Sequence, residues 1–514
     1  MHEVIIVGAG PGGLQLAYFL EQLGIKYKVL ERSNICGSFF KKYPAQKRLI
    51  SINKIHTGHE SKVKNLRWDW NSLLSSDLKP SFSEFDEKFF PHSDSLVKYL
   101  NEFASYHDLT IEFCVDVQTI DRFEGGFRLV DSQGREHKSK ILVVGTGFSK
   151  SYVPEIPGIE HCIEYGEISN LKEFVGRDVL IIGKGNSAFE TANSLTPYAS
   201  NIHLISPNDF RFAWETHFPG DVRSVNDDFL DTFFLKQQNA ILNGVVKSIE
   251  ACATGYEVVI SYTDDIDVDN QDPILAEQTL NHYDKVVKCT GFGLDLEPFA
   301  ESCSPNTVRN GRLPELTPEW ESVNIPNLFF VGTLTQSNDF KRSSSAFIAG
   351  LRFNAEVLSR FLDCRINNKA WSYDLLEPGT LYSKITERLT FSSSLWHQFS
   401  SLVDLFELQA EPRAAYRHYA DVPMNSFKQD KRFENFTGFL FCFGFDAPID
   451  PEERKIFSEH GFIHPILRYY SNGKLIKDCH MREDIYGNWA NLEVFGLPFR
   501  QVLDEFSGVD IQDA

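Results

Sequence analysis

The chain has no closely spaced pair of cysteines. Its nine cysteines are scattered, and none belongs to a Cys-x-x-Cys or Cys-x4-Cys pair. A disulfide oxidoreductase needs such a pair at its active site, and zinc sites need clustered thiolates, so the sequence argues against both classes. We expect no metal site and free cysteines, which favours the reducing cytoplasm.

Basic residues and long apolar runs are also scarce. The chain has 51 Lys and Arg against 71 Asp and Glu, a net charge of −20, which argues against nucleic acid or an anionic membrane as the main partner. No apolar run approaches the length of a transmembrane helix. An apolar strand that begins at Val4 leaves no room for a secretion signal. We expect a cytoplasmic, globular chain of two or three domains, without a membrane span.

Two glycine motifs stand in matching contexts. Residues 8–13 read Gly-Ala-Gly-Pro-Gly-Gly after Val-Ile-Ile-Val, and residues 183–188 read Gly-Lys-Gly-Asn-Ser-Ala after Val-Leu-Ile-Ile. Each predicts a buried strand, a tight turn and a helix whose N-terminus holds a diphosphate. Two such motifs predict two dinucleotides bound at once, as in a flavoprotein that a nicotinamide reduces.

The two units differ at the end of their second strand. Glu31 ends the first unit's strand, where a carboxylate accepts the ribose hydroxyls of FAD. The strand at residues 201–206 ends without an acidic residue, and Arg211 follows. A missing carboxylate and a nearby arginine favour the 2′-phosphate of NADPH over NADH. The alternative is that Arg211 is a solvated loop residue.

Further apolar segments fit a two-domain plan. Residues 141–147 and 286–291 are predicted strands ending in Thr-Gly, residues 327–333 form the last strand of the FAD domain, and a helix over 345–362 points its N-terminus at the flavin. We therefore predict an α/β fold of two Rossmann-like domains followed by an α+β extension. The predicted boundaries are 1–150 and 296–365 for the FAD domain, 151–295 for the inserted NADPH domain and 366–514 for the extension.

The extension is not needed to bind two nucleotides. Alternating strands are predicted at residues 437–445 and 465–470, and a helix at 498–506. The extension either caps the active site, forms a homodimer contact or has a purely structural role.

Several stretches carry a resemblance to a known group of enzymes. They include Ser-Phe-Phe-Lys-Lys-Tyr-Pro at 38–44, Arg-Trp-Asp-Trp-Asn-Ser at 67–72 and Thr-His-Phe-Pro-Gly-Asp-Val-Arg at 216–223. The chain resembles the class B flavin-dependent monooxygenases (Baeyer–Villiger, N-hydroxylating and flavin-containing enzymes). Within them it is most similar to the FAD-dependent oxidoreductase-domain family named for a flavoprotein of endoplasmic-reticulum-associated degradation. The stretch at 165–169 lacks the histidine of the Baeyer–Villiger signature, which leaves the oxygenase subclass open.

The resemblance implies an activity. NADPH would reduce FAD, O2 would add at the flavin C4a, and the resulting (hydro)peroxyflavin would oxygenate a small organic substrate by Baeyer–Villiger insertion or heteroatom hydroxylation, in specialised metabolism. Two alternatives stay open. One is a flavin reductase or electron-transfer flavoprotein without oxygenation, and the other is a non-enzymatic FAD-binding partner protein.

Four residues are candidate catalytic groups. By resemblance, Asn53 lies beside the flavin, where its amide suits holding a peroxide. His217 suits proton donation, and Arg223 suits a peroxyanion or the NADP phosphates. Arg342 follows the last FAD strand and is a further candidate for the peroxyanion. The alternative for each is an ordinary structural contact.

The motifs and the resemblance together define the expected cofactor sites. For FAD the expected residues are Gly8, Gly10, Pro11, Gly12, Gly13, Leu14, Glu31, Arg32, Ser38, Phe39, Asn53, Val117, Thr146, Gly147, Gly332 and Thr333. For NADPH they are Gly183, Gly185, Asn186, Ser187, Ala188, Arg211, Thr290 and Gly291.

Overall fold

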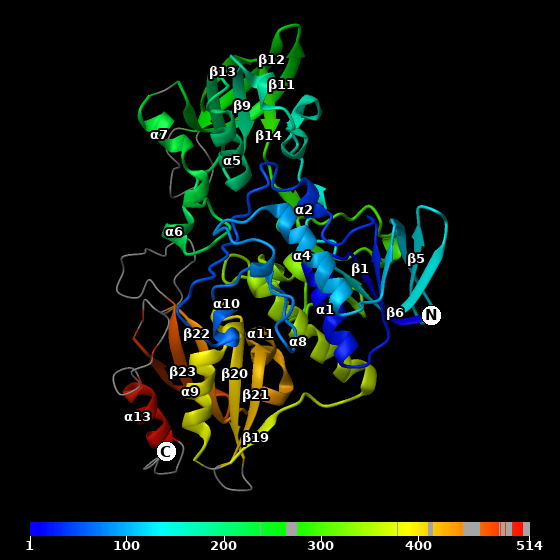
Figure 1. The fold of residues 1–514 in the computed structure, drawn as a ribbon, viewed down its shortest axis with the longest axis vertical. Helices are drawn as coiled ribbons and strands as arrows, with labels where there is room; N and C mark the ends of the chain where they lie inside the picture. The colour runs from blue at the N-terminus through cyan, green and yellow to red at the C-terminus, as the bar shows by residue number, and fades with distance from the viewer. Residues whose placement is uncertain are drawn as a thin grey trace.

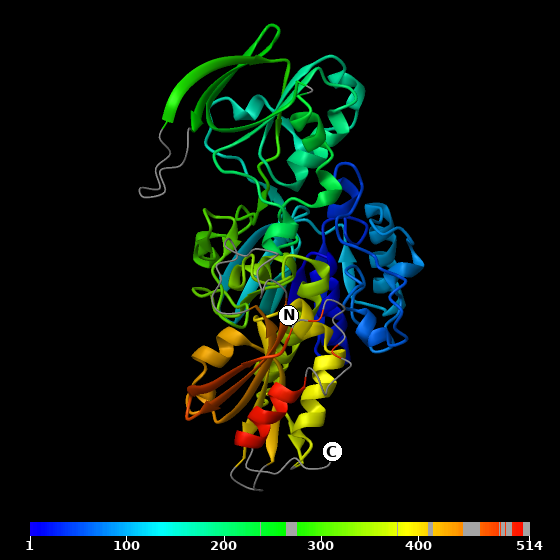
Figure 2. The same cartoon turned by 90° about the vertical axis from the view of Figure 1, so that its left-hand side faces the viewer.

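Three units follow one another along the long axis of the molecule (Figures 1 and 2). They are seen in a computed structural model that describes residues 1–236, 238–263, 275–377, 379–409, 415–445, 463–482, 484, 489 and 496–506. The first unit lies in the middle, between the second and the third. None of the helices in these ranges is long and apolar enough to cross a membrane.

The first unit is built on a sheet whose central strands are apolar along their whole length. Val4, Ile5 and Ile6 are fully buried, as expected for parallel strands covered on both faces. The parallel strands, in spatial order, are β3 (Ile111–Phe113), β2 (Tyr27–Glu31), β1 (His2–Val7), β6 (Glu136–Val144) and β18 (Leu328–Phe330). An antiparallel pair, β4 (Val117–Phe123) and β5 (Gly126–Asp131), continues from β6.

Three long helices accompany this sheet: α1 (Pro11–Gln22), α4 (Ser93–Tyr106) and α8 (Ile348–Asn367), with α1 packed along α8. The helix predicted over 345–362 begins later and ends later than expected. The hydroxyls of Ser343 and Ser345 donate to the Asp339 carboxylate, and this turn lies just before the helix. At the other end, Asn368 adopts a left-handed conformation with φ of 49° and stops the helix.

The second unit repeats the plan of the first. Its sheet has the order β13 (Leu275–Tyr283), β12 (Gly255–Thr263), β11 (Ala240–Cys252), β10 (Asn201–Ser206), β9 (Asp178–Ile182), β14 (Lys285–Lys288) and β8 (Ile163–Glu164). The last five are parallel, and helix α5 (Asn186–Leu195) follows β9 directly. The α/β fold that the sequence predicts for the inserted domain is thus confirmed.

Two short strands carry the chain between these units. β7 (Lys150–Ser151) and β15 (Phe292–Gly293) pair antiparallel at the crossing. The strands predicted to end in Thr-Gly stop at Val144 and Lys288, so both Thr-Gly pairs lie in the connections.

The third unit is an antiparallel sheet with helices, as predicted for the extension. Its strand order is β19 (Asp374–Leu376), β21 (Tyr416–Pro423), β20 (Leu402–Leu408), β22 (Gly438–Gly444), β23 (His464–Ser471) and β24 (Lys474–His480). Its helices include α9 (Leu381–Phe391), α10 (Ser393–His397), α11 (Met424–Gln429) and α13 (Leu497–Phe506). Phe406, Phe441 and Phe499 belong to the same hydrophobic core as Leu14 and Leu358 of α1 and α8. The third unit therefore folds against the first and is not a detached appendage.

Shorter elements complete the described structure. They include α2 (Phe39–Lys42), α3 (Lys62–Asn65), α6 (Ala213–Thr216), α7 (Phe229–Phe234), β16 (Thr307–Val308), β17 (Leu313–Pro314) and several 3-10 segments, among them η7 (Gly332–Asn338).

Candidate active site

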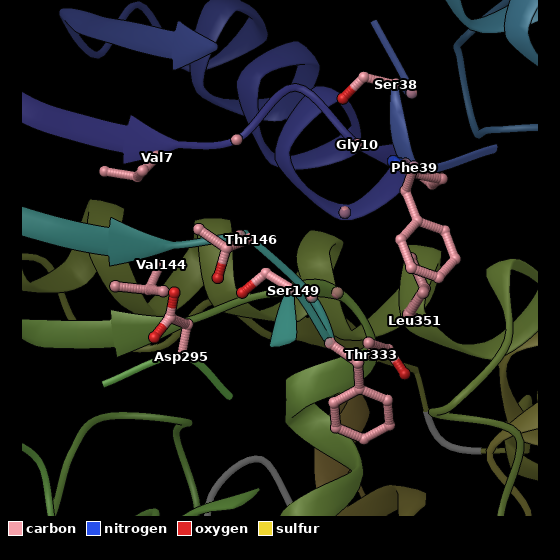
Figure 3. A pocket seen from close by; sticks show the side chains of 18 of the residues that line it. Val7, Gly10, Ser38, Phe39, Val144, Thr146, Ser149, Asp295, Thr333 and Leu351 are labelled. Carbon is pink, nitrogen blue, oxygen red and sulfur yellow. The ribbon is translucent and has the colours of Figure 1, made fainter. Parts of the chain in front are cut away.

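A cavity of about 940 Å³, the cofactor cavity, lies at the carboxyl ends of the first sheet's parallel strands. Figure 3 shows Val7, Val144 and Thr146 at the ends of β1 and β6, with Gly10 at the turn into α1 and Thr333 across the cavity. The carboxyl edge of a parallel α/β sheet is where such folds bind ligands. The volume suits a cofactor-sized ligand.

The glycines of the first motif are required by close backbone contacts. A Cβ on Gly12 would lie 2.4 Å from the Cα of Gly332, and a Cβ on Gly13 would lie 2.0 Å from the carbonyl oxygen of Gly8. Gly10 is different, because a Cβ there would meet nothing within 4 Å. Gly10 lines the cavity at the N-terminus of α1, so the free space is where a diphosphate would rest on the helix N–H groups. The residues present therefore fit a dinucleotide.

Glu31 is held at the end of β2 by a fixed set of donors. Its carboxylate accepts hydrogen bonds from the backbone N–H of Ala9 at 2.8 Å and of Ser33 at 3.0 Å. The Ser38 hydroxyl donates to it at 3.2 Å. Glu31 and Ser38 both line the cavity, so the carboxylate is positioned to receive ribose hydroxyls.

Most residues expected at the FAD site line this cavity. They are Gly8, Gly10, Pro11, Gly12, Glu31, Arg32, Ser38, Phe39, Val117, Thr146, Gly147, Gly332 and Thr333. Gly13 and Leu14 are buried behind the turn, where they pack α1 against the sheet.

Asn53 lies away from the cavity. Its side chain is buried and its amide donates to the carbonyl of Asp86 at 2.5 Å. Ser51, two residues earlier, lines the cavity instead. The contact of Asn53 is structural in this geometry, and a role beside the flavin stays a prediction.

Residues 216–223, which we call the dividing loop, separate the cofactor cavity from a second cavity of about 500 Å³. Phe218, Gly220 and Asp221 line the cofactor cavity, whereas His217, Pro219 and Arg223 line the second cavity. The loop follows α6 at the lower edge of the second unit (Figure 1). One segment thus forms a wall of both cavities.

The dividing loop is attached to the first unit at two points. The Asp221 carboxylate accepts from Thr216 Oγ1 at 2.7 Å within the loop and from Lys341 Nζ at 3.0 Å across the unit boundary. Arg223 Nη1 donates to the carbonyl of Ile50 at 3.0 Å. These contacts hold the loop over the cofactor cavity.

Asn186 of the second glycine motif fixes the loop from the other side. Its amide nitrogen donates to the carbonyls of Gly220 at 3.1 Å and Asp221 at 2.7 Å, and its oxygen accepts from the backbone N–H of Arg223 at 2.9 Å. The second nucleotide motif and the dividing loop are therefore one connected structure, which the motif spacing alone does not show.

The candidate catalytic residues are placed differently from one another. His217 ends α6 with a left-handed φ of 57°, and its ring packs edge-on against Phe445. Arg223 lies over the Trp70 ring at 5.7 Å, and burial lowers the pKa of its guanidinium. Arg342 is exposed and lines neither cavity, whereas its neighbour Lys341 lines the cofactor cavity. The sequence predicts that a residue after the last FAD strand reaches the cavity. In the structure that residue is Lys341 and not Arg342.

The glycines of the second motif are constrained as those of the first are, with one packed against backbone and one facing open space. A Cβ on Gly183 would lie 2.3 Å from the carbonyl oxygen of Cys289, whereas a Cβ on Gly185 would meet nothing within 4 Å. Ala188 is fully buried against the sheet. Ser187, Thr290 and Gly291 line a narrow recess beside the motif. The open side at Gly185 fits a second diphosphate at the N-terminus of α5.

Lys184 was not among the expected residues. Its ammonium donates to the carbonyl of Asn208 at 3.2 Å, just beyond the end of β10, and to the Asn243 side chain. Burial lowers its pKa to about 8. The signal available in the sequence was a lysine inside a motif otherwise made of small and neutral residues. Arg211 also lies beyond β10, and its carbonyl accepts from Val222 N–H at 2.9 Å.

The cysteines lie away from both cavities. All nine are free thiols in the described structure, and none is among the described residues that line the cofactor cavity or the second cavity. Cys289 is the cysteine next to the second motif, and burial raises the pKa of its thiol. A thiol pair placed to exchange electrons with a bound flavin is thus missing from these linings.

The fold and the cavity define the class of two-dinucleotide-binding flavoproteins. The sequence profile of the pyridine nucleotide-disulphide oxidoreductase family matches residues 5–332, and the chain belongs to that family. The chain is 30% identical over 99% of its length to FAD-dependent oxidoreductase domain-containing protein 2 of Mus musculus and 31% identical to that of Danio rerio, spanning 84% of each. It therefore belongs with these FAD-dependent oxidoreductase-domain proteins, and the expected recognition is confirmed.

A solved structure shows the same fold. A flavin-containing monooxygenase from Stenotrophomonas maltophilia superposes with a TM-score of 0.55 at 20% identity, over 71% of this chain and all of that chain. Family and fold together make the protein a flavin-dependent oxidoreductase, for which FAD is the expected cofactor.

Proposed function

We propose that the protein is an NADPH-dependent FAD monooxygenase that oxygenates a small organic molecule. The observation that supports this most is the dividing loop, which places an aromatic-lined second cavity directly beside the cofactor cavity, with no cysteine among the described residues of either lining. When bound, FAD would accept a hydride from NADPH and pass the electrons to O2. One oxygen atom would enter the substrate, and the other would leave as water with two protons.

The chain's own residues would hold the two nucleotides at defined places. The N-terminus of α1 at Gly10 would take the FAD diphosphate and Glu31 the ribose hydroxyls, while Thr333 and the first turn of α8 would lie at the flavin ring. The N-terminus of α5 at Gly185 would take the NADPH diphosphate. Arg211 and Lys184 would lie toward the 2′-phosphate, since both follow or face the end of β10.

Exclusion of water is the second task of an oxygenase, because water in the site opens side reactions of reactive intermediates. Phe218 of the dividing loop contacts Phe347 with ring centroids 6.3 Å apart, and both line the cofactor cavity. Phe347 precedes α8, so this aromatic pair lies where the loop meets the expected flavin site. The pair would shield that end of the cavity from solvent.

The missing thiols favour O2 as the electron acceptor over a disulfide. Reduction of a disulfide by thiol exchange needs a reactive cysteine that has a low pKa and access to the flavin. Here burial raises the pKa of Cys36 and Cys289 to about 12. These thiols are protonated at neutral pH and do not face the cavity.

The test is a coupled assay on the FAD-loaded protein. NADPH oxidation, O2 uptake and hydrogen peroxide release are measured together, with a panel of ketones, amines and aromatic compounds. The proposal predicts that NADPH is used in preference to NADH, and that at least one compound lowers peroxide release and gains one oxygen atom by mass spectrometry. NADPH oxidation fully recovered as peroxide or as reduced dye for every compound would identify a reductase. No NADPH oxidation at all would favour a non-enzymatic FAD-binding protein.

A further inference from the structure

The second cavity is built by all three units. Trp70 and Phe90 come from the first unit, and Trp214, His217 and Arg223 come from the second. The third unit adds Trp396, His397 and Phe399, which follow α9. A lining of three tryptophans and several phenylalanines suits a flat aromatic ligand, and about 500 Å³ is within the range of small-molecule sites.

The second cavity lies close to the cofactor cavity, and residues that line the two are in contact. Phe347 lines the cofactor cavity, and its ring lies 6.1 Å from that of Trp70, which lines the second cavity. Ile50, whose carbonyl accepts from Arg223, stands between Leu49 and Ser51, which both line the cofactor cavity. A ligand in the second cavity is therefore next to the place expected for the flavin ring.

The charge of this lining is unusual for so acidic a chain. Among the described residues that line it there is one arginine, Arg223, and no Asp, Glu or Lys. Within the described structure Arg223 has no carboxylate at ion-pair distance, and its guanidinium contacts the Ile50 carbonyl and the Trp70 ring. His397 adds no charge near neutral pH, because burial and the nearby Arg352 lower its pKa to about 3. A half-buried cation without a counterion is costly to keep unless a ligand supplies the negative charge.

We propose that the second cavity is the substrate site and that its ligand is an aromatic compound carrying one anionic group, most simply a carboxylate. The anion pairs with Arg223, and the ring packs among the indoles of Trp70, Trp214 and Trp396, which all line the cavity. The third unit thus forms part of the substrate site. This inference rests on the proposed function in that it treats the bound compound as the molecule to be oxygenated.

The test compares a charged probe with its neutral analogue on the FAD-loaded full chain. Calorimetric titrations with 2-naphthoate and 2-naphthamide measure the same ring with and without the charge. Because a hydrogen bond to a charged group is worth more than a neutral one, we expect naphthoate to bind at least about tenfold more tightly. Arg223→Gln removes this difference. Arg177→Gln, an exposed arginine of the second unit paired with Asp284 at 3.1 Å, keeps it.

A second variant keeps the test decisive if Arg223→Gln does not fold. Trp214→Ala removes an indole that is 46% exposed, so the fold tolerates its loss. This variant lowers the affinity for naphthoate and for naphthamide by the same factor. It removes a contact with the ring, which both probes have, and leaves the pairing of the anion with Arg223. Equal binding of the two probes to the unaltered protein, or no effect of Trp214→Ala on either, overturns the proposal.

The nucleotide phosphates are the other source of negative charge for Arg223. NADP+ is therefore titrated as a third probe. The proposal predicts that Arg223→Gln leaves NADP+ affinity within about twofold. A loss of more than about tenfold for NADP+, with the naphthoate preference intact, assigns the arginine to the nucleotide and overturns the proposal.

Failure of this inference is distinguishable from failure of the proposed function. Naphthoate binding that depends on Arg223, together with NADPH oxidation that yields only peroxide with every compound, supports the anion site and contradicts oxygenation. Oxygenation of a neutral compound with no charge preference contradicts the anion site and supports the function.

Discussion

Neighbouring glycines in one motif meet different surroundings. Gly12 and Gly13 pack against backbone, so a methyl group there would displace the turn. Gly10 and its counterpart Gly185 face open space, and their φ values of −80° and −92° are ones that alanine adopts freely. A methyl group at either position would therefore block a ligand without straining the fold.

Gly10→Ala and Gly185→Ala form a matched pair. We expect Gly10→Ala to purify with less than about a tenth of the FAD of the unaltered protein, since the methyl occupies the diphosphate position. Gly185→Ala keeps its FAD but is reduced by NADPH at least tenfold more slowly at low NADPH. Flavin absorbance and anaerobic reduction rates measure both. Equal FAD content in the two variants would contradict the assignment of the motifs.

The buried His397 makes the stability of the folded protein depend on pH. Its pKa falls from 6.5 to about 3 on folding, because burial disfavours the imidazolium. Between these values the unfolded chain binds a proton that the folded protein does not, so stability is full above pH 6.5 and falls as pH drops toward 3, by at most about 1.4 kcal/mol per pH unit. In His397→Gln, which keeps a donor for the Leu66 carbonyl, urea midpoints between pH 6.5 and 5 should fall less steeply. His161→Gln, at an exposed histidine, serves as the control, and equal slopes in all three proteins would contradict the assignment.

At the scale of elements, the dividing loop connects the two nucleotide units. Its attachments are Lys341 to Asp221, Arg223 to the Ile50 carbonyl, and Asn186 to the loop backbone. The resemblance marks this stretch in the sequence and makes His217 and Arg223 candidate catalytic residues. That its alternate residues face two different cavities could not be predicted, because this depends on how the second unit sits on the first.

Lys341→Met tests the attachment of the dividing loop. The variant loses the ion pair with Asp221, in which the lysine is 29% exposed, while the methionine keeps the apolar stem near Phe218. A looser loop admits water, so we expect peroxide release per NADPH consumed to rise about twofold or more, with unchanged FAD content. Lys369→Met, which loses an exposed pair with Asp363 at 3.0 Å, is the control. Identical peroxide yields in both variants would show that this pair does not hold the loop.

The side chains that line a cavity were harder to predict than the helices and strands. Glu31 lines the cofactor cavity, because a strand end fixes a side chain's position, and its role toward FAD stays a prediction. Asn53 is expected at the flavin by resemblance, and Arg342 from its position after the last FAD strand. Both lie in loops, and the loop geometry places Ser51 and Lys341 at the cavity instead. The sequence does not predict a role for Lys184, because its direction toward Asn208 follows from a tertiary contact.

At the scale of the whole molecule, the third unit is joined to the first by a buried arginine. Arg67 is 1% exposed, and its guanidinium donates to the carbonyls of Leu389 at 2.7 Å and Ser392 at 3.1 Å. It also lies over the rings of Trp396 and Phe443, at 5.1 and 5.5 Å. The two-domain plan is predictable from repeated strand-turn-helix motifs. This joining is not, because the stretch at 67–72 indicates only a resemblance and does not show that Arg67 contacts Leu389 and Ser392.

Arg67→Met is expected to destabilise the whole chain. Two carbonyls of the third unit lose their donor, which corresponds to about 2–4 kcal/mol of unfolding free energy. Urea unfolding followed by circular dichroism and by FAD release should shift together, because one core spans both units. The control is Lys62→Met on the short helix α3. An unchanged midpoint, or a shift in the circular dichroism transition alone, would show that the two units unfold independently.

The most direct test of the account follows the flavin itself as it meets oxygen. NADPH-reduced enzyme is mixed with oxygenated buffer, and absorbance is recorded by stopped flow. The account predicts that the flavin passes through a spectrum belonging to neither its reduced nor its oxidised form, because the dividing loop and the Phe218–Phe347 pair exclude water from the cavity. A direct return to oxidised FAD, with one peroxide released per NADPH both with and without aromatic acids present, would contradict it.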